Sequence, residues 1–310
     1  LEKLKSSFMN DSVLSTSIFN KMVPVNDFEI TVPNFFEETC SFKVLHFFEG
    51  NTKNLYLLEL DSVTRTRKST TIFKRVELKI DFVIPLRHRS IITPQGKIFL
   101  TGGVEQNRAL NVTLKLNEHE NTLELKKRMI TSRKSHGICY LNGFIYCIGG
   151  FTDEEGYSAQ CERYDILADK WEAISPMNHK ASSPSVCAFG KHFIYRIGGL
   201  CATRMITETI EKYDIREDKW TAYEVKSQVV GFKLLWLSAS CQINRNQIII
   251  CGGCDENDVP SAQTFLFEVP EVLERGEKAA FKIKRINPNG LPNGGGFWNM
   301  QAIVYDQKAY

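Results

Sequence analysis

The sequence of 310 residues lacks any long hydrophobic run, since its apolar residues come in short bursts such as 144–150 and 194–199. A helix that crosses a bilayer needs about 20 consecutive apolar residues, so the sequence excludes a helical membrane span. The first ten residues, LEKLKSSFMN, lack the apolar stretch of a secretory signal. We therefore expect no membrane partner. Because residue 1 is Leu and not Met, we expect the chain to be a piece of a longer protein.

A disulfide framework is also missing. Nine cysteines are scattered along the chain, and their number is odd, so we infer a reducing, cytoplasmic setting. Cys251 and Cys254 form a CxxC, but no second pair follows at the spacing of a zinc site. A redox-active thiol usually lies at a helix N-terminus, and here the two cysteines flank a glycine pair. We interpret this CxxC as structural.

Sequence motifs of catalysis are absent. There is no GxxxxGK[ST] phosphate loop and no GxSxG nucleophile turn, and none of the six histidines forms an HxH or HxxxH pair. The basic run at 126–128 is not interleaved with aromatic residues, as a nucleic-acid stacking surface would be. The sequence therefore predicts no enzyme, no cofactor, no metal and no nucleic-acid partner.

The net charge of +3 is small, but it is unevenly distributed. Between residues 51 and 137 there are 17 Lys or Arg against 8 Asp or Glu. Such an excess can attract an acidic partner. The alternative is a solvated, lysine-rich surface with no partner.

What the sequence does contain is an internal repeat with a period near 50 residues. ERYDILADKW (162–171) and EKYDIREDKW (211–220) agree at seven of ten positions at an offset of 49. Segments 143–150 and 192–199 repeat at the same offset, and Gly-Gly pairs begin at residues 102, 149, 198 and 252. Each unit shows four short aromatic and β-branched runs, separated by Asn, Asp, Gly and Lys, which predict strands. Four-stranded units at this period are typical of propeller blades.

This pattern resembles the kelch-repeat family. The resemblance covers residues 40–310 and implies an all-β fold, a kelch-type β-propeller of four-stranded antiparallel blades in which each Trp faces the next blade. An N-terminal unit without Gly-Gly, four Gly-Gly units and the segment 299–310, which resembles 135–146, lead us to expect six blades in a chain incomplete at both ends. The alternative is five blades, with 299–310 joining the N-terminal strands. The residues that carry the blade motif are Gly102, Gly103, Gly149, Gly150, Tyr164, Asp165, Trp171, Gly198, Gly199, Tyr213, Asp214, Trp220, Gly252 and Gly253.

Residues 1–39 lie outside the repeat, and we expect a linker or the end of an upstream helical segment there. In the repeat itself, glycine at the end of the second strand lets backbones approach closely. Asp165 and Asp214 are expected to bond the turn that leads to the Trp strand.

Propellers bind partners through the loops at their faces, here the loops after each Gly-Gly and the linkers between blades. The resemblance implies a non-enzymatic protein-interaction scaffold, and we expect a cytoskeletal or ciliary assembly component whose partner has an acidic surface such as that of tubulin. The alternative is the substrate-recognition subunit of a ubiquitin ligase. A third hypothesis, a copper oxidase or a sugar-processing propeller, has no local ligand pattern to support it. The candidate partner-binding residues are Arg87, Arg89, Arg108, Arg133, Lys134, Tyr157 and Trp298, each with loop packing or ring closure as the alternative role.

Overall fold

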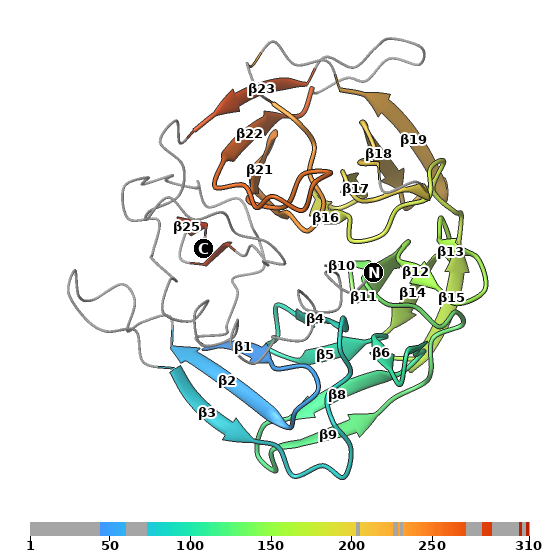
Figure 1. Cartoon of the computed structure of the whole chain (residues 1–310), viewed down its shortest axis with the longest axis vertical. Helices are drawn as coiled ribbons and strands as arrows, with labels where there is room; N and C mark the ends of the chain where they lie inside the picture. The colour runs from blue at the N-terminus through green and yellow to red at the C-terminus, as the bar shows by residue number, and fades with distance from the viewer. Residues whose placement is uncertain are drawn as a thin grey trace, which may run out of the picture.

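The computed structural model is built from β-strands arranged around a central axis (Figure 1). The expected linker at 1–39, the start of the predicted propeller domain and the candidate residue Trp298 lie outside the part of the chain that the structure describes. The described residues are 44–59, 73–202, 205–225, 229, 232–270, 281–286, 304–305 and 308–309.

Five antiparallel sheets follow one another around the axis, and we number them blades I to V in chain order. Within each, the strands run in chain order from one edge of the sheet to the other. Blade I comprises β1 (Val44–Phe48), β2 (Asn54–Glu59) and β3 (Phe73–Glu77). Blade II comprises β4 (Arg89–Ile92), β5 (Ile98–Thr101), β8 (Thr113–Asn117) and β9 (Thr122–Leu125). Blade III comprises β10 (Gly137–Leu141), β11 (Phe144–Ile148), β14 (Cys161–Asp165) and β15 (Lys170–Ile174).

Blades IV and V continue the ring. Blade IV comprises β16 (Ser185–Phe189), β17 (Phe193–Ile197), β18 (Thr209–Asp214) and β19 (Lys219–Glu224). Blade V comprises β20 (Ala239–Asn244), β21 (Gln247–Cys251), β22 (Thr264–Glu268) and β23 (Lys282–Arg285). Short hairpins project from blades II and III, namely β6 (Val104–Glu105) with β7 (Arg108–Ala109) and β12 (Phe151–Thr152) with β13 (Gly156–Tyr157). The predicted all-β propeller of four-stranded antiparallel blades is confirmed.

The number of blades differs from the expected six. The described residues form five blades, and after them only the two-stranded hairpin of β24 (Val304–Tyr305) and β25 (Lys308–Ala309). Both strands of this hairpin contact β20, the innermost strand of blade V, and the hairpin lies between blades V and I in Figure 1. A segment as short as 299–310 can supply one hairpin but not four strands.

The predicted likeness between 299–310 and 135–146 is nevertheless correct in its pairing. Val304 pairs with Ala309 as Tyr140 pairs with Ile145, which is the register that the alignment of the two segments requires. The hairpin therefore has the geometry of the first two strands of a blade. The alternative's count of five blades is therefore correct, but among the described residues the hairpin pairs with itself and not with β1.

Blade I holds three strands in the described residues, and they correspond to the second, third and fourth strands of the other blades. The loop between β1 and β2 supplies Asn51, whose N–H donates to Ile84 O in the following linker. The loop after β5 makes the matching contact, since Gly103 N–H donates to Arg133 O in the linker after blade II. Among the described residues, β1 is therefore the inner edge of its sheet.

Two tryptophans join neighbouring blades. Trp171 and Trp220 are each only 5% exposed. The indole N–H of Trp171 donates to Lys127 O, and that of Trp220 donates to Ser175 O, in both cases on the preceding blade. The expectation that each indole faces the next blade is wrong in direction. Each Trp side chain lies on the face of its sheet that packs against the preceding blade. Burying about 150–250 Å² of indole at each contact still makes it a main inter-blade contact.

The turn between the third and fourth strands carries two carboxylates with different roles. Asp165 accepts the N–H groups of Leu167 and Ala168, so its predicted role in the turn is confirmed, and Asp214 does the same for Arg216. The second carboxylate, Asp169, crosses to the preceding blade and accepts the N–H of residue 127 at 2.9 Å. The same arrangement recurs one blade later. Each turn is thus stabilised within its blade and tied to its neighbour.

Candidate functional site

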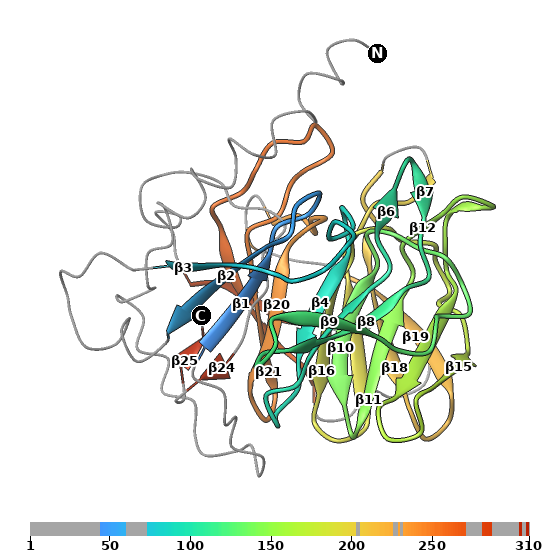
Figure 2. The same cartoon turned by 90° about the horizontal axis from the view of Figure 1, so that it is seen from below.

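Both loop sets that the sequence points to meet at one end of the ring, where the hairpins of blades II and III project (Figure 2). Each linker between blades forms a two-bond bridge with the first residue of the hairpin loop in the blade that it enters. This bridge recurs in four blades. We call this end the hairpin face. The bridged pairs are Leu86 with Val104, Lys134 with Phe151, Ser182 with Leu200 and Trp236 with Cys254.

The four linkers also bond to one another around the axis. Ser135 N–H donates to Arg87 O at 3.1 Å, Ser183 N–H to Ser135 O at 2.6 Å, and Leu237 N–H to Ser183 O at 3.0 Å. All four residues are left-handed, with φ between 52° and 57°. A residue other than glycine costs about 1 kcal/mol or more in this conformation. Each of the four linkers therefore holds a strained residue at the same structural position. The hairpin face therefore rests on a continuous and conformationally defined backbone belt.

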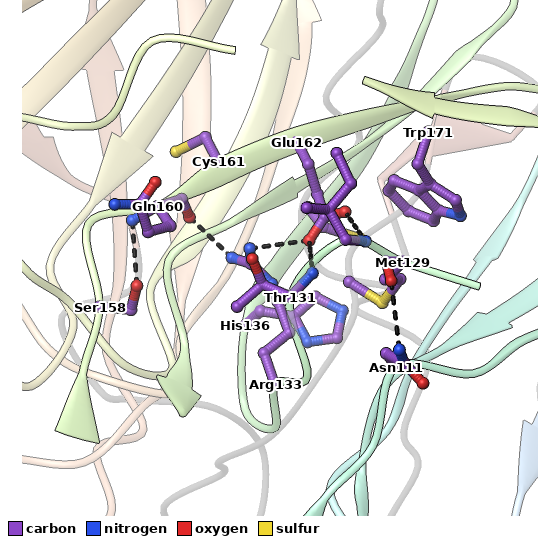
Figure 3. Close-up of polar contacts among 12 residues, drawn as sticks. Asn111, Met129, Thr131, Arg133, His136, Ser158, Gln160, Cys161, Glu162 and Trp171 are labelled. Atoms are coloured by element: carbon purple, nitrogen blue, oxygen red, sulfur yellow. Dashed lines mark hydrogen bonds and ion pairs between the residues drawn. The ribbon is translucent and has the colours of Figure 1, made fainter. Parts of the chain in front are cut away.

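The side chain of Arg133 points toward Glu162 and Gln160 of blade III (Figure 3). Its side chain is fully buried and donates to Gly149 O and Gln160 O, both at 2.7 Å. It also forms an ion pair with Glu162 at 2.8 Å. Glu162 in turn accepts two backbone N–H groups of the linker that carries the arginine. The prediction that Arg133 binds a partner is wrong, because its charge is already neutralised inside blade III, and the alternative of ring closure is correct.

Blade IV contains the same buried pair but takes its arginine from another strand. Glu211 stands at the position of Glu162, 49 residues later, and its partner is Arg196 of β17. Arg196 is fully buried and also donates to carbonyls and hydroxyls between residues 198 and 209. In blade III the strand position equivalent to Arg196 is Cys147, and the cation comes from the linker instead. The carboxylate thus occupies the same strand position in both blades, whereas the arginine comes from the linker in blade III and from the second strand in blade IV.

Comparison with known families agrees with this architecture. A family model described as the Kelch motif matches residues 132–178, which run from the linker before β10 to the end of blade III. The protein also superimposes on a solved chain titled "Structure of YjhT" with a TM-score of 0.62 at 12% identity, covering 86% of this chain and 88% of that one. The chain is a kelch-repeat β-propeller.

Sequence relatives of this kelch propeller include three Kelch-like proteins. Kelch-like protein 41a of Danio rerio is 29% identical over 106 residues, which are 33% of this chain and 18% of the relative. Kelch-like protein 22 of Homo sapiens is 34% identical over 73 residues, 23% of this chain and 11% of the relative. Kelch-like protein 15 of Homo sapiens is 25% identical over 199 residues, 54% of this chain and 32% of the relative. The chain thus spans less than a third of the length of these curated relatives.

The remaining candidate residues of the kelch propeller differ in how accessible they are. Arg87 and Arg108 are exposed on the hairpin face. Arg89, the first residue of β4, is partly buried and donates from Nε to His136 O at 2.8 Å, so it joins blade II to the linker that follows it. Lys134 lies 5.1 Å from the ring centroid of Phe151 and 3.9 Å from an Asp153 carboxylate oxygen. Tyr157 packs edge-on against the same phenylalanine at a centroid distance of 5.5 Å.

Lys134 and Arg87 lie close enough to influence each other. Burial, followed by the positive charge of Arg87, lowers the pKa of Lys134, while the Asp153 carboxylate opposes this shift. Asp153 also accepts the N–H of Ala109 at 2.7 Å and so ties the hairpins of blades II and III together. Arg87 and Arg108 are thus exposed beside a mostly buried Lys134, and the same two hairpins also carry exposed carboxylates at Glu105, Asp153, Glu154 and Glu155.

Three residues of the hairpin face were missed by the sequence reasoning. Met205 and Val259 are 61% and 55% exposed in the loops of blades IV and V. Trp236 is half-buried in the linker before blade V and donates from its indole to Asp255 O at 2.9 Å. Aligning the loops after each Gly-Gly from their ends, instead of from the glycines, would have placed Met205 and Val259 at the loop position that Arg108 occupies in blade II.

No group of three or more His, Cys, Asp or Glu is placed to hold a metal ion in the part of the chain that the structure describes. The buried cysteines among these residues are not activated, since burial raises the pKa of Cys147 and Cys187 to about 12. Likewise, no helix within the described ranges is long and apolar enough to cross a membrane.

Two histidines beneath the hairpin face are neutral in the folded protein. Burial lowers the pKa of His88 to about 4. Burial and then the charges of Arg133 and Arg89 hold the pKa of His136 well below its usual range. In the unfolded chain each has an ordinary pKa of about 6.5. Their contribution to stability is therefore complete above about pH 6.5 and is lost as the pH falls from there toward the folded values.

Between about pH 6.5 and pH 5 we expect the free energy of unfolding to fall by about 2 kcal/mol for each of these two histidines. Urea unfolding across this pH range measures the loss. His88→Gln should remove the part of the pH dependence of unfolding that comes from His88. His192→Gln is the control, because His192 lies exposed between β16 and β17. Identical pH dependence in the H88Q variant and the unmodified protein would contradict the assignment.

Proposed function

We propose that this kelch propeller is a non-enzymatic protein-interaction domain whose partner binds across the hairpin face. The observation that carries the proposal is the combination of a rigid backbone belt with exposed side chains on four successive loops. A preorganised scaffold that presents variable loops lowers the ordering cost of binding. Its relatives' names, all Kelch-like proteins, are consistent with a domain of this kind.

Two exposed arginines, one in the linker before blade II and one in the hairpin of blade II, support an acidic partner. Arg87 and Arg108 are exposed, and Lys134 lies 3.9 Å from an Asp153 carboxylate oxygen. An exposed guanidinium suits bidentate pairing with carboxylates. We therefore retain the acidic cytoskeletal surface, with tubulin as its example, as the partner to be tested first, in a cytoplasmic, cytoskeletal or ciliary setting.

The test is co-sedimentation of the purified full chain with polymerised tubulin at low and at high salt. We expect binding that weakens with salt, and a loss of about tenfold or more in affinity for the Arg87→Glu, Arg108→Glu double variant. Lys170→Glu is the matched control, since its side chain is 65% exposed on the outer strand of blade III. If the affinity changes neither with salt nor in the double variant, tubulin is not a partner that binds through this face.

The alternative, substrate recognition for a ubiquitin ligase, would use the same face but needs a ligase-recruiting module outside residues 40–310. It predicts that the longer protein, and not this domain alone, binds a ligase subunit. Mass spectrometry of complexes purified with the longer protein distinguishes the two, because a ligase subunit found at stoichiometric amounts favours the alternative.

A further inference from the structure

A small cavity lies between blades IV and V, beneath the linker that joins them. Its apolar walls include Ile197 of blade IV, Phe232 of the linker, and Ile250 and Phe265 of blade V. The cavity leaves about 10 Å³ for the centre of a water-sized sphere, which is close to the minimum that one water molecule needs. It therefore has room for one water molecule and not for a larger ligand.

The space is present because a large side chain of an earlier linker has a small counterpart here. Between blades II and III, the imidazole of His136 bonds through Nε2 to Thr101 Oγ1 of β5 at 2.8 Å. The equivalent residues between blades IV and V are Ser238 and Ile197, and both line the cavity. Since the serine side chain is much smaller than an imidazole, it does not fill the same volume.

The hydroxyl of Ser238 is a buried polar group at the wall of this cavity. Ser238 is only 6% exposed, and its Oγ forms no hydrogen bond with the residues that the structure describes. Buried hydroxyls are normally bonded either to protein or to an ordered water. Ser240, two residues further along the chain, follows this rule, because its Oγ accepts a hydrogen bond from Ser185 Oγ at 2.6 Å. The need for a further partner is thus specific to Ser238.

A backbone carbonyl supplies the second polar group. In blades III and IV, the carbonyl of the first glycine of the pair accepts a hydrogen bond from a buried guanidinium, at 2.7 Å from Arg133 and at 3.2 Å from Arg196. The corresponding glycine of blade V is Gly252, which lines the cavity. The positions of the two arginines hold Leu235 and Ile250 there, and neither side chain can donate a hydrogen bond.

We propose that this cavity binds one structural water molecule, which donates to Gly252 O and accepts a hydrogen bond from the Ser238 hydroxyl. A water that bridges two buried polar groups is nearly as favourable as a direct hydrogen bond between them. At the junction of blades IV and V, the water takes the place that a guanidinium has in blades III and IV. The inference does not depend on the proposed function, since it concerns the ring and not the partner.

The first test is a crystal structure of the full chain at a resolution that shows ordered waters. We expect one water peak in the cavity, within about 2.5–3.2 Å of both Ser238 Oγ and Gly252 O. A cavity without a water peak, or a peak that reaches neither group, overturns the proposal.

The second test uses variants and counts long-lived waters in solution by magnetic relaxation dispersion. Ser238→Ala should lose the peak and lower the count by one, because the water then keeps a single protein partner. Ser240→Ala is the matched control, since this buried serine bonds to Ser185 and does not line the cavity. A count that is unchanged in S238A, or that falls equally in both variants, overturns the assignment to Ser238. If S238A does not fold, the crystal structure of the unmodified protein decides.

Discussion

Arg196→Met is expected to lower the free energy of unfolding by about 3–5 kcal/mol, because it leaves the Glu211 carboxylate buried without its cation. Both side chains of this pair are fully buried. Burial raises the pKa of Glu211, but the charge of Arg196 and the hydrogen bonds from Asn178 outweigh it and hold that pKa below its usual range. The carboxylate is therefore ionised in the folded protein. Urea unfolding near neutral pH measures the loss.

The protein itself supplies the control for this prediction. In blade V the positions equivalent to Arg196 and Glu211 hold Ile250 and Phe265, which are buried among apolar neighbours. The double variant Arg196→Ile, Glu211→Phe should therefore recover most of the stability that Arg196→Met loses, since a well-packed apolar pair often equals a buried ion pair. If the double variant is as unstable as the single one, the loss comes from packing and not from the uncompensated charge.

The repeat explains why this much of the fold could be predicted. Trp171, Tyr164 and Asp165 recur 49 residues later because blades III and IV repeat the same turn and the same contact with the preceding blade. The direction of the indole could not be predicted, because alternation along a strand gives two faces but not which neighbour each face meets. The blade count could not either, because it depends on segments outside the repeated motifs.

The candidate site was harder to predict because it depends on which way single side chains point. Arg133 and Arg87 are both linker arginines in the sequence, yet one is fully buried and the other exposed. A signal for the difference was present. Glu162 and Glu211 align on a strand whose other blades carry apolar residues at that position, and a buried carboxylate requires a cation nearby. Tyr157 proved to pack against its own loop, and Trp298 remains a prediction.

Gly198→Ala is expected to cost about 3 kcal/mol or more, which is a large share of the 5–15 kcal/mol that stabilises a typical domain. Gly198 has φ +61°, and a Cβ there would overlap the backbone carbonyl of Leu235 in the next linker. That carbonyl accepts the N–H of Gly199, so moving it away would also weaken the bond that closes blade IV onto blade V. The left-handed conformation adds about 1 kcal/mol of its own.

Gly190→Ala separates these two costs. Gly190 has nearly the same backbone conformation, φ +59°, but a Cβ there would meet nothing within 4 Å. It should therefore lose only the conformational share of about 1 kcal/mol. Urea unfolding of both variants gives the difference, which measures the close approach between blades. Equal losses at residues 190 and 198 would mean that the linker can shift freely, and the belt beneath the hairpin face would then not be the rigid support on which partner binding depends.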